Sequence, residues 1–405
     1  MIKKQWVLIA LFYLVLAATF GLLLRLQLFS SLFSLNYKFI LHTHSHVALL
    51  GWVFTALFIA IVYAFLPAYI QKYKVLFWIT QISVVGMLFS FPFQGYAAIS
   101  IIFSTLFLFV SYWFTYGFFS HTNKLRVSKK TLPLSFSIIR ASLLYLVFSS
   151  IGPWALGPMM VLEMKGTDLY NFAIYFYLHF LYNGFFTLAI LGIFFRILEQ
   201  KNIAFQQATA QRVFNYINWS IIPTFFLSTL GISPPNIIYI LASFGALLQV
   251  LALYYFIVIL KGIPIQTFSK WALFLFKIAL LAFSLKIIMQ LFSAIPWLVI
   301  HIHETKNSVV IGYLHMVLLG FVSVFLLAYF ISNRSLLITK KISRIGILTF
   351  LIGLIGSEFI LFGQGGLQWI GITALPHYYE WLFTVSMLMP MGLLPFFFSQ
   401  LGLRK

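Results

Sequence analysis

The sequence predicts an all-α integral membrane protein with twelve transmembrane helices. Hydrophobic residues make up 62% of its 405 residues and charged residues only 8%, which lies far outside the range of soluble globular domains. Apolar runs of about 20 residues recur along the chain, the length that a helix needs to cross a hydrocarbon core of ~30 Å. A β-barrel would instead show short strands that alternate apolar and polar residues, and it would not be so uniformly hydrophobic.

The expected spans follow one another with short connections, within a single membrane domain of residues 1–405. The first begins after Lys3 and Lys4 and lacks a small-residue cleavage site, so we expect an uncleaved helix rather than a signal peptide. The spans lie roughly at residues 5–28, 38–66, 73–92, 95–119, 135–160, 170–197, 215–233, 236–261, 269–295, 308–332, 342–363 and 378–402.

The basic residues predict the orientation of these helices. The net charge is +20, and most lysines and arginines fall in loops on the same side as the N-terminus, among them Lys72, Lys124 and Lys340. Cytoplasmic loops of membrane proteins carry this excess. Both termini are therefore expected in the cytoplasm, in a multi-pass protein of the inner (cytoplasmic) membrane. The charge indicates contact with anionic lipids of the bilayer, and no nucleic acid partner is expected.

A histidine followed after four residues by glycine and an aromatic residue occurs three times at nearly even spacing. The histidines are 133 and 136 residues apart, and each opens a long apolar run. This spacing predicts a threefold internal repeat, approximately 1–120, 130–262 and 265–405, with the helices in a pseudo-threefold 4+4+4 arrangement. The three copies are His46 with Gly51 and Trp52, His179 with Gly184 and Phe185, and His315 with Gly320 and Phe321.

The rarer polar residues predict a site near the outer face of the membrane. All histidines except His121 and all acidic residues except Glu199 fall in the outer half of the membrane or in outer loops. Imidazoles and carboxylates that gather at one depth of a hydrophobic protein indicate a site. The glycine of each repeat would leave a notch for a flat macrocycle or for a neighbouring helix. In the second case the histidines would only pack the helices.

The segment HTHSHVALLGWVF, residues 42–54, carries three histidines on two helical faces. His42 and His46 are four residues apart and share one face, whereas His44 lies about 200° away from them. Neutral imidazole binds heme iron, copper or zinc, and heme needs an axial imidazole beside a flat apolar slot. The chain has no cysteine, which excludes disulfides, thiolate metal sites and cysteine-linked heme.

These motifs resemble the heme-copper oxidase subunit I superfamily, specifically its C-family oxidases and NnrS-like relatives. The segment at 42–54 is similar to a pattern that C-family oxidases carry on their tenth helix, and YLHFLYNGFFTLAILG, residues 177–192, is similar to their copper-ligand helix. The resemblance implies a b-type heme, with copper or iron as further metals. It makes His44 or His46 the partner of His315 as axial ligands of a low-spin heme, and it matches His179 to the copper ligand of the sixth helix.

The chain departs from this family at two helices. The seventh span has no histidine, and the tenth has only His315 where the family has two ligands. His301 and His303 lie in an outer HIHE segment, which supplies substitute metal ligands if it folds inward and is otherwise a solvated loop. His42 is a further candidate metal ligand. An oxygen-reducing binuclear centre of the usual form is therefore not expected.

Two charged residues of the spans are expected to bind the cofactor. Arg25 and Lys286 both lie toward the outer side, where they would pair with heme propionates. For Lys286 the alternatives are an ion pair with Glu358 and extension of the side chain to the membrane surface.

Two functional classes remain open at this stage. In the first, the protein binds heme or another metal and acts in electron transfer or in redox chemistry of oxygen or nitric oxide. It would then be an oxidoreductase with an electron-donor subunit or a small redox protein as its partner. In the second, it is a transporter or a heme- or copper-handling protein that uses the same histidines without redox turnover. The polar residues cluster on one side of the membrane, which favours a site over a pathway.

Overall fold

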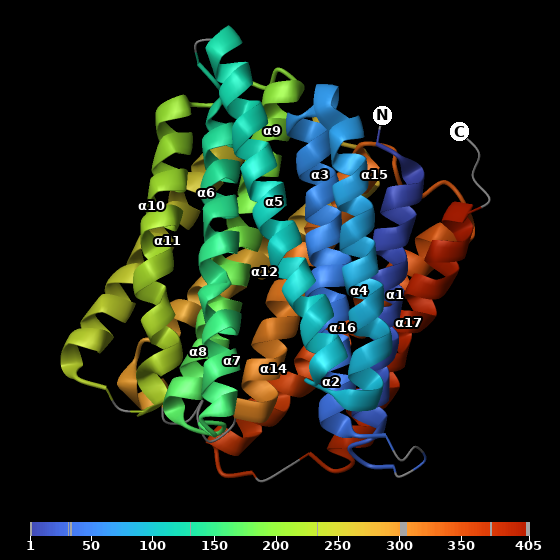
Figure 1. The fold of residues 1–405 in the computed structure, drawn as a ribbon, viewed down its shortest axis with the longest axis vertical. Coiled ribbons are helices and arrows are strands. Elements are labelled where there is room, and N and C mark those ends of the chain that lie inside the picture. The colour runs from blue at the N-terminus through green and yellow to red at the C-terminus, as the bar shows by residue number, and fades with distance from the viewer. Residues whose placement is uncertain are drawn as a thin grey trace.

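The computed structural model of the protein describes residues 2–30, 32, 35–129, 131–232, 234–299, 306–372 and 375–401. Within these residues every regular element is helical, as the sequence predicts. The helices lie side by side in one elongated bundle (Figure 1).

Eleven helices of the described chain are long and apolar enough to cross a membrane, which identifies a multi-pass membrane protein. Eight of these spans are α1 (Lys4–Leu26), α4 (Lys74–Gln94) preceded by η2 (Pro67–Tyr73), α5 (Ala98–Lys129), α6 (Leu134–Ser149) continued by α7 (Ile151–Val161), α11 (Asn236–Lys261), α12 (Lys270–Phe292), α16 (Lys341–Trp369) and α17 (Tyr378–Leu401). The other three consist of three pieces each: α2 (Tyr37–His46), η1 (Val47–Phe54) and α3 (Thr55–Phe65); α8 (Asp168–His179), η3 (Phe180–Phe186) and α9 (Thr187–Gln200); α14 (Lys306–His315), η6 (Met316–Ser323) and α15 (Val324–Ser332).

The predicted seventh span, 215–233, falls on a helix that does not belong to the eleven. Here α10 (Gln207–Phe225) begins eight residues earlier than expected and passes into the 3₁₀-helix η4 (Phe226–Ile232). Its first turns carry Gln207, Gln211 and Asn215, so its mean hydropathy is lower than that of its neighbours. It nevertheless packs against α11, and the two helices lie side by side in Figure 1.

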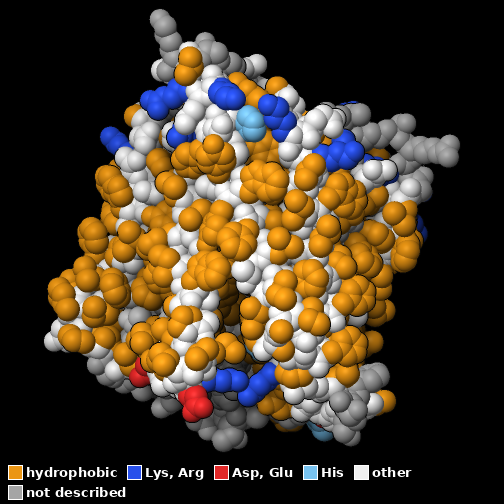
Figure 2. Space-filling model, in the orientation of Figure 1, with side chains coloured by type: hydrophobic (Ala, Val, Ile, Leu, Met, Phe, Trp, Pro, Cys, Tyr) orange, Lys and Arg blue, Asp and Glu red, His pale blue; other side chains and the backbone are white. Residues whose placement is uncertain are grey.

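Three spans form the centre of the bundle. The apolar window of the span from α2 to α3 is 94% buried, that from α8 to α9 is 89% buried and that from α14 to α15 is 78% buried, whereas the other spans are 33–50% buried. The outer helices expose large apolar side chains, such as Phe89 (68%) and Phe359 (75%). Figure 2 shows an uncharged belt of such side chains over the face in view, which suits a hydrocarbon environment. The central spans are those that carry the repeat histidines.

Each central span changes its helical form directly after its histidine. The π-helices η1, η3 and η6 begin at the residue that follows His46, His179 and His315, respectively. A π-turn contains more residues per turn than an α-turn, is rare, and occurs often at functional sites. The sequence repeat is therefore also a repeat of an uncommon backbone form, which the residue pattern alone does not indicate.

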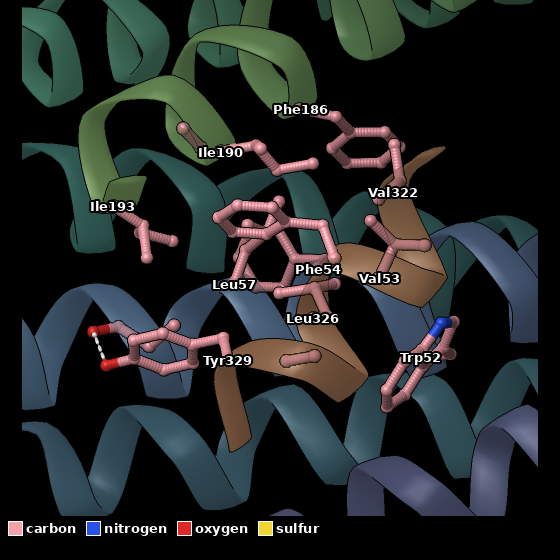
Figure 3. Close-up of a cluster of buried hydrophobic side chains, with 14 of the residues drawn as sticks. Trp52, Val53, Phe54, Leu57, Phe186, Ile190, Ile193, Val322, Leu326 and Tyr329 are labelled. Carbon is pink, nitrogen blue, oxygen red and sulfur yellow. Dashed lines mark hydrogen bonds between the residues drawn. The ribbon is translucent and has the colours of Figure 1, made fainter. Parts of the chain in front are cut away.

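A hydroxyl group closes each π-helix at its far end. Thr55, Thr187 and Ser323 each donate a hydrogen bond to the carbonyl five residues earlier, at 3.2, 2.8 and 2.7 Å. Ser323 also accepts a hydrogen bond of 2.7 Å from the indole Nε1 of Trp52 and so joins two of the central spans. Figure 3 shows the apolar core around this contact, where side chains of all three central spans interlock.

The glycines of the repeat make room for neighbouring helices. A Cβ atom on Gly51 would lie 3.0 Å from the ring of Tyr13 in α1, and one on Gly184 would lie 2.6 Å from Tyr145 in α6. One on Gly320 would lie 3.2 Å from Ala282 in α12. The notches thus hold the helices that precede the central spans, which is one of the two occupants that the sequence left open.

The ends of the bundle differ in charge. The helix α1 begins and α17 ends at the same end of the bundle (Figure 1). On the face in Figure 2, most lysine and arginine side chains gather toward that end, and only a few lie at the other.

Candidate functional site

Two histidines from different central spans face each other. His44 of α2 and His315 of α14 have ring centroids 6.5 Å apart, with the ring planes at 64°. Both side chains are partly buried. The two residues are far apart in the sequence, so the packing of the central spans creates this pair.

The Nδ1 atom of each ring is directed at the backbone. His44 Nδ1 donates to the carbonyl of Ala17 in α1 at 2.9 Å, which leaves the lone pair on Nε2. His315 Nδ1 is buried and faces the carbonyl of Ile311, one turn earlier, without a hydrogen bond of normal geometry. No hydrogen bond to another described residue engages Nε2 of either ring. For His44 this is the arrangement in which a backbone carbonyl fixes the ring and leaves Nε2 able to bind a metal.

The spacing of the rings fits one metal ion between them. A metal–imidazole bond is about 2 Å long and a ring nitrogen lies roughly 1.2 Å from the centroid, so two imidazoles in line with one metal have centroids about 6.4 Å apart. The observed 6.5 Å agrees with this distance. Two neutral imidazoles and no other ligand are a donor set that suits heme iron.

Gly21 in α1 permits the position of His44. A Cβ atom there would lie 3.0 Å from Cε1 and 3.4 Å from Nδ1 of His44, closer than ordinary van der Waals contact. Neither Gly21 nor the carbonyl of Ala17 belongs to a motif, so the sequence carried no signal for them.

The guanidinium of Arg25 lies near these rings. Arg25 is only 8% exposed, and its charge is near enough to act on His44, His315 and Glu358. Its Nη1 reaches the carbonyl of Leu382 at 3.5 Å, and both carboxyl oxygens of Glu358 are buried without a hydrogen-bond partner. Arg25 therefore lies near both imidazoles, and its role as a partner of heme propionates stays a prediction.

His42 and His46 form a separate group on the opposite face of α2, as the helical spacing predicts. His46 Nδ1 contacts the carbonyl of His42 at 2.8 Å, and its Nε2 lies 3.2 Å from the hydroxyl of Tyr96. The His46 ring packs on Phe91 of α4 at 4.4 Å, and the His42 ring packs on Tyr96 at 4.6 Å. Of the two candidates that the resemblance left open, His44 is thus the one that faces His315.

His179 uses both ring nitrogens within the protein. Nε2 donates to the carbonyl of Ile221 in α10 at 2.7 Å, and Nδ1 accepts from the amide of Asn183 at 3.1 Å. The residue is 3% exposed. In this arrangement the imidazole has no lone pair left for a metal, so it joins α8 to α10.

Lys286 lies near His179 and forms a buried polar cluster with two glutamines. Its Nζ donates to Gln290 at 2.7 Å and to Gln249 at 3.3 Å, and the side chain is 1% exposed. Its charge acts on His179. The alternatives of an ion pair with Glu358 and of extension to the membrane surface are therefore wrong, because Nζ bonds to the two glutamines and the side chain is buried. The role of Lys286 as a partner of heme propionates stays a prediction.

The remaining predicted ligands, His301 and His303, lie outside the described residues. Among the described residues, no group of three or more histidine, cysteine, aspartate or glutamate side chains is placed to hold a metal ion. The pair of His44 and His315 therefore has no third histidine or carboxylate beside it among the described residues.

No protein-family model matches the chain, and the curated proteins contain no match to it.

Proposed function

We propose that the protein is a membrane heme protein that acts in electron transfer, with a b-type heme between His44 and His315. The observation that carries the proposal is the 6.5 Å separation of the two imidazole centroids, a distance that would suit two imidazoles held on one heme iron. The resemblance of the motifs to heme-copper oxidases, which also place axial histidines on the second and tenth helices, supports the same pair.

Bound heme would supply one-electron chemistry at an iron with both axial positions filled by protein. The chain's own groups would hold it. The carbonyl of Ala17 fixes the ring of His44, and Arg25 offers a positive charge to the propionates. If His44 and His315 both held the heme, it would favour electron transfer over binding of oxygen or nitric oxide.

The proposal includes no copper ion at His179. Its two hydrogen bonds, to Ile221 and Asn183, would have to break before either nitrogen bound a metal. We therefore propose a heme-copper-oxidase-like scaffold in which the copper position has become a polar contact between helices.

The finer architecture belongs to the same proposal. Counting α10 as a span gives twelve helices, in three sets of four that each contribute one central span. The charge of the loops supports cytoplasmic termini and a place in the inner membrane, with an electron donor as partner.

Optical spectroscopy of the purified full-length protein, produced with sufficient heme, tests this function. We expect a reduced-minus-oxidised spectrum of low-spin heme that is lost in His44→Ala and in His315→Ala. The matched control is His46→Ala, on the opposite face of the same helix, which should keep the spectrum. Because the ring planes stand at 64°, the oxidised heme should also show a strongly anisotropic low-spin EPR signal.

A preparation that contains no heme would refute the proposal. So would a heme whose spectrum survives in both variants of the pair. A heme that binds but cannot be reduced by any mild donor would refute electron transfer and favour heme handling.

A further inference from the structure

The helix α10 lies with α11 at one edge of the bundle (Figure 1). One side of α10 is buried, where Val213, Ile217 and Thr224 are at most 3% exposed. The opposite side carries a row of residues that are four, three and four positions apart and therefore share one helical face. This outer row consists of Gln211, Asn215, Asn218 and Ile222.

The amide of Asn218 lies at the depth of the hydrocarbon core. The hydroxyl of Thr224 accepts from the amide of Gln249 at 3.4 Å, and Gln249 is near the middle of the span α11. Asn218 precedes Thr224 by six residues, which is about 9 Å along the helix. Half of a hydrocarbon core is about 15 Å, so lipid tails surround the outer row at this level.

The amides of the outer row are not satisfied within the described part of the chain. Tyr145 bonds to the backbone carbonyl of Asn218, whose side chain makes no hydrogen bond to a described residue. Its amide atoms are not among the enclosed polar atoms that lack a partner, and the residue is half-buried, so a neighbouring helix can reach them. Asn215 Oδ1 accepts from Gln211 at 2.8 Å, which leaves the NH₂ group of Asn215 available.

These groups indicate a partner that supplies hydrogen bonds inside the membrane. Lipid tails have neither donors nor acceptors, so an amide exposed to them loses the hydrogen bonds that it makes in water. Asparagine and glutamine side chains of transmembrane helices bond across helix interfaces instead. The outer row therefore has the composition of a helix contact rather than of a lipid-facing surface.

A second copy of the chain matches the outer row in depth and in chemistry. Two copies inserted in the same orientation would run their α10 helices parallel, with Asn218 opposite Asn218. A carboxamide has both a donor and an acceptor, so across a twofold axis each Asn218 can donate to the other. Parallel helix pairs use a contact asparagine in this way. Trp219 and Ile222, 59% and 57% exposed, would add apolar contact.

We propose that α10 is the contact between two copies of this protein in the membrane, with a symmetric pair of Asn218 side chains at its centre. The proposal does not depend on heme, because none of the residues near His44 and His315 takes part in it.

Disulfide cross-linking of the full-length protein in its membrane tests the contact. The chain has no cysteine, so a single introduced cysteine reports on one position. Ile222→Cys keeps all amides of the outer row and, oxidised with copper phenanthroline, should form a product of two copies. Phe359→Cys on α16, which replaces a side chain that is 75% exposed, is the matched control and should stay uncross-linked.

A second measurement tests the role of the amide. The dissociation constant of the dimer is measured in liposomes by single-molecule photobleaching at several protein-to-lipid ratios. Asn218→Leu should raise it about tenfold, because the two hydrogen bonds of the symmetric pair are lost. Asn218→Gln, which keeps the amide, should restore most of the affinity. Both variants should melt as the unaltered protein does in detergent, since the Asn218 side chain has no bond to a described residue.

Three results would overturn the proposal. The first is an equal yield of cross-linked dimer from Ile222→Cys and Phe359→Cys, which would indicate random collision. The second is a cross-link of Ile222→Cys to a different protein only, which would make that protein the occupant of the outer row. The third is a dissociation constant that Asn218→Leu leaves unchanged.

Discussion

Gly21→Ala is expected to weaken heme binding by displacing His44, although residue 21 would not touch the heme itself. The added methyl carbon would lie 3.0 Å from Cε1 and 3.4 Å from Nδ1 of the ring, where ordinary contacts lie between 3.4 and 4 Å. The ring must therefore move by several tenths of an ångström, away from the helix whose Ala17 carbonyl holds it at 2.9 Å. Since α1 also packs closely on η1, the helix cannot move instead.

The size of the effect follows from the hydrogen bond that holds the ring. Loss of a bond worth about 1 kcal/mol weakens binding about fivefold, and misalignment of the ligand adds to this. We expect a five- to tenfold lower affinity for heme, measured by heme titration of the protein purified without heme. The absorption bands of the bound low-spin heme should also shift.

Gly363→Ala in α16 is the matched control. A Cβ atom at Gly363 would meet nothing within 4 Å, and alanine in place of glycine stabilises a helix slightly. This variant should bind heme as the unaltered protein does. If Gly21→Ala bound heme with the same affinity and spectrum, His44 would not be an axial ligand in the observed position.

Two further predictions concern stability in detergent, measured by thermal unfolding. Ser323→Ala leaves the buried indole N–H of Trp52 without an acceptor and should lower the free energy of unfolding by about 1–3 kcal/mol. Thr187→Ala should lower it less, because the Thr187 hydroxyl bonds to a carbonyl of its own span. Equal losses in the two variants would contradict this reasoning. Lys286→Met removes a buried amino group and should leave the melting temperature nearly unchanged. Gln290→Ala leaves that group with Gln249 as its weaker partner and should lower the melting temperature. A larger loss in Lys286→Met than in Gln290→Ala would show that the lysine stabilises the fold.

The membrane class could be predicted from the sequence because it depends on composition. Apolar runs of sufficient length reveal transmembrane helices without any knowledge of their neighbours. The span at 215–233 was misplaced for the same reason: α10 begins with polar residues such as Gln211, which it can include because it packs against α11. The hydropathy of the residues alone gives no information on that packing.

The candidate site could be predicted only in part. Helical geometry placed His44 opposite His42 and His46, since the 3.6-residue period is local. It did not indicate that His179 would meet the carbonyl of Ile221, 42 residues away, or that Lys286 would meet Gln249 rather than Glu358. Such contacts depend on how the helices pack, and no spacing within one helix encodes them.

The π-helices uncouple the two halves of each central span. An α-helix advances about 100° per residue, so one additional residue in a turn rotates everything beyond it by that angle. The half that carries His44 or His315 can therefore place its ring beside the partner ring, while the half that carries Leu57 or Tyr329 packs in the apolar core, and neither requirement fixes the other. Substitutions in the histidine-bearing half can therefore alter the surroundings of the imidazoles and leave the packing of the other half unchanged.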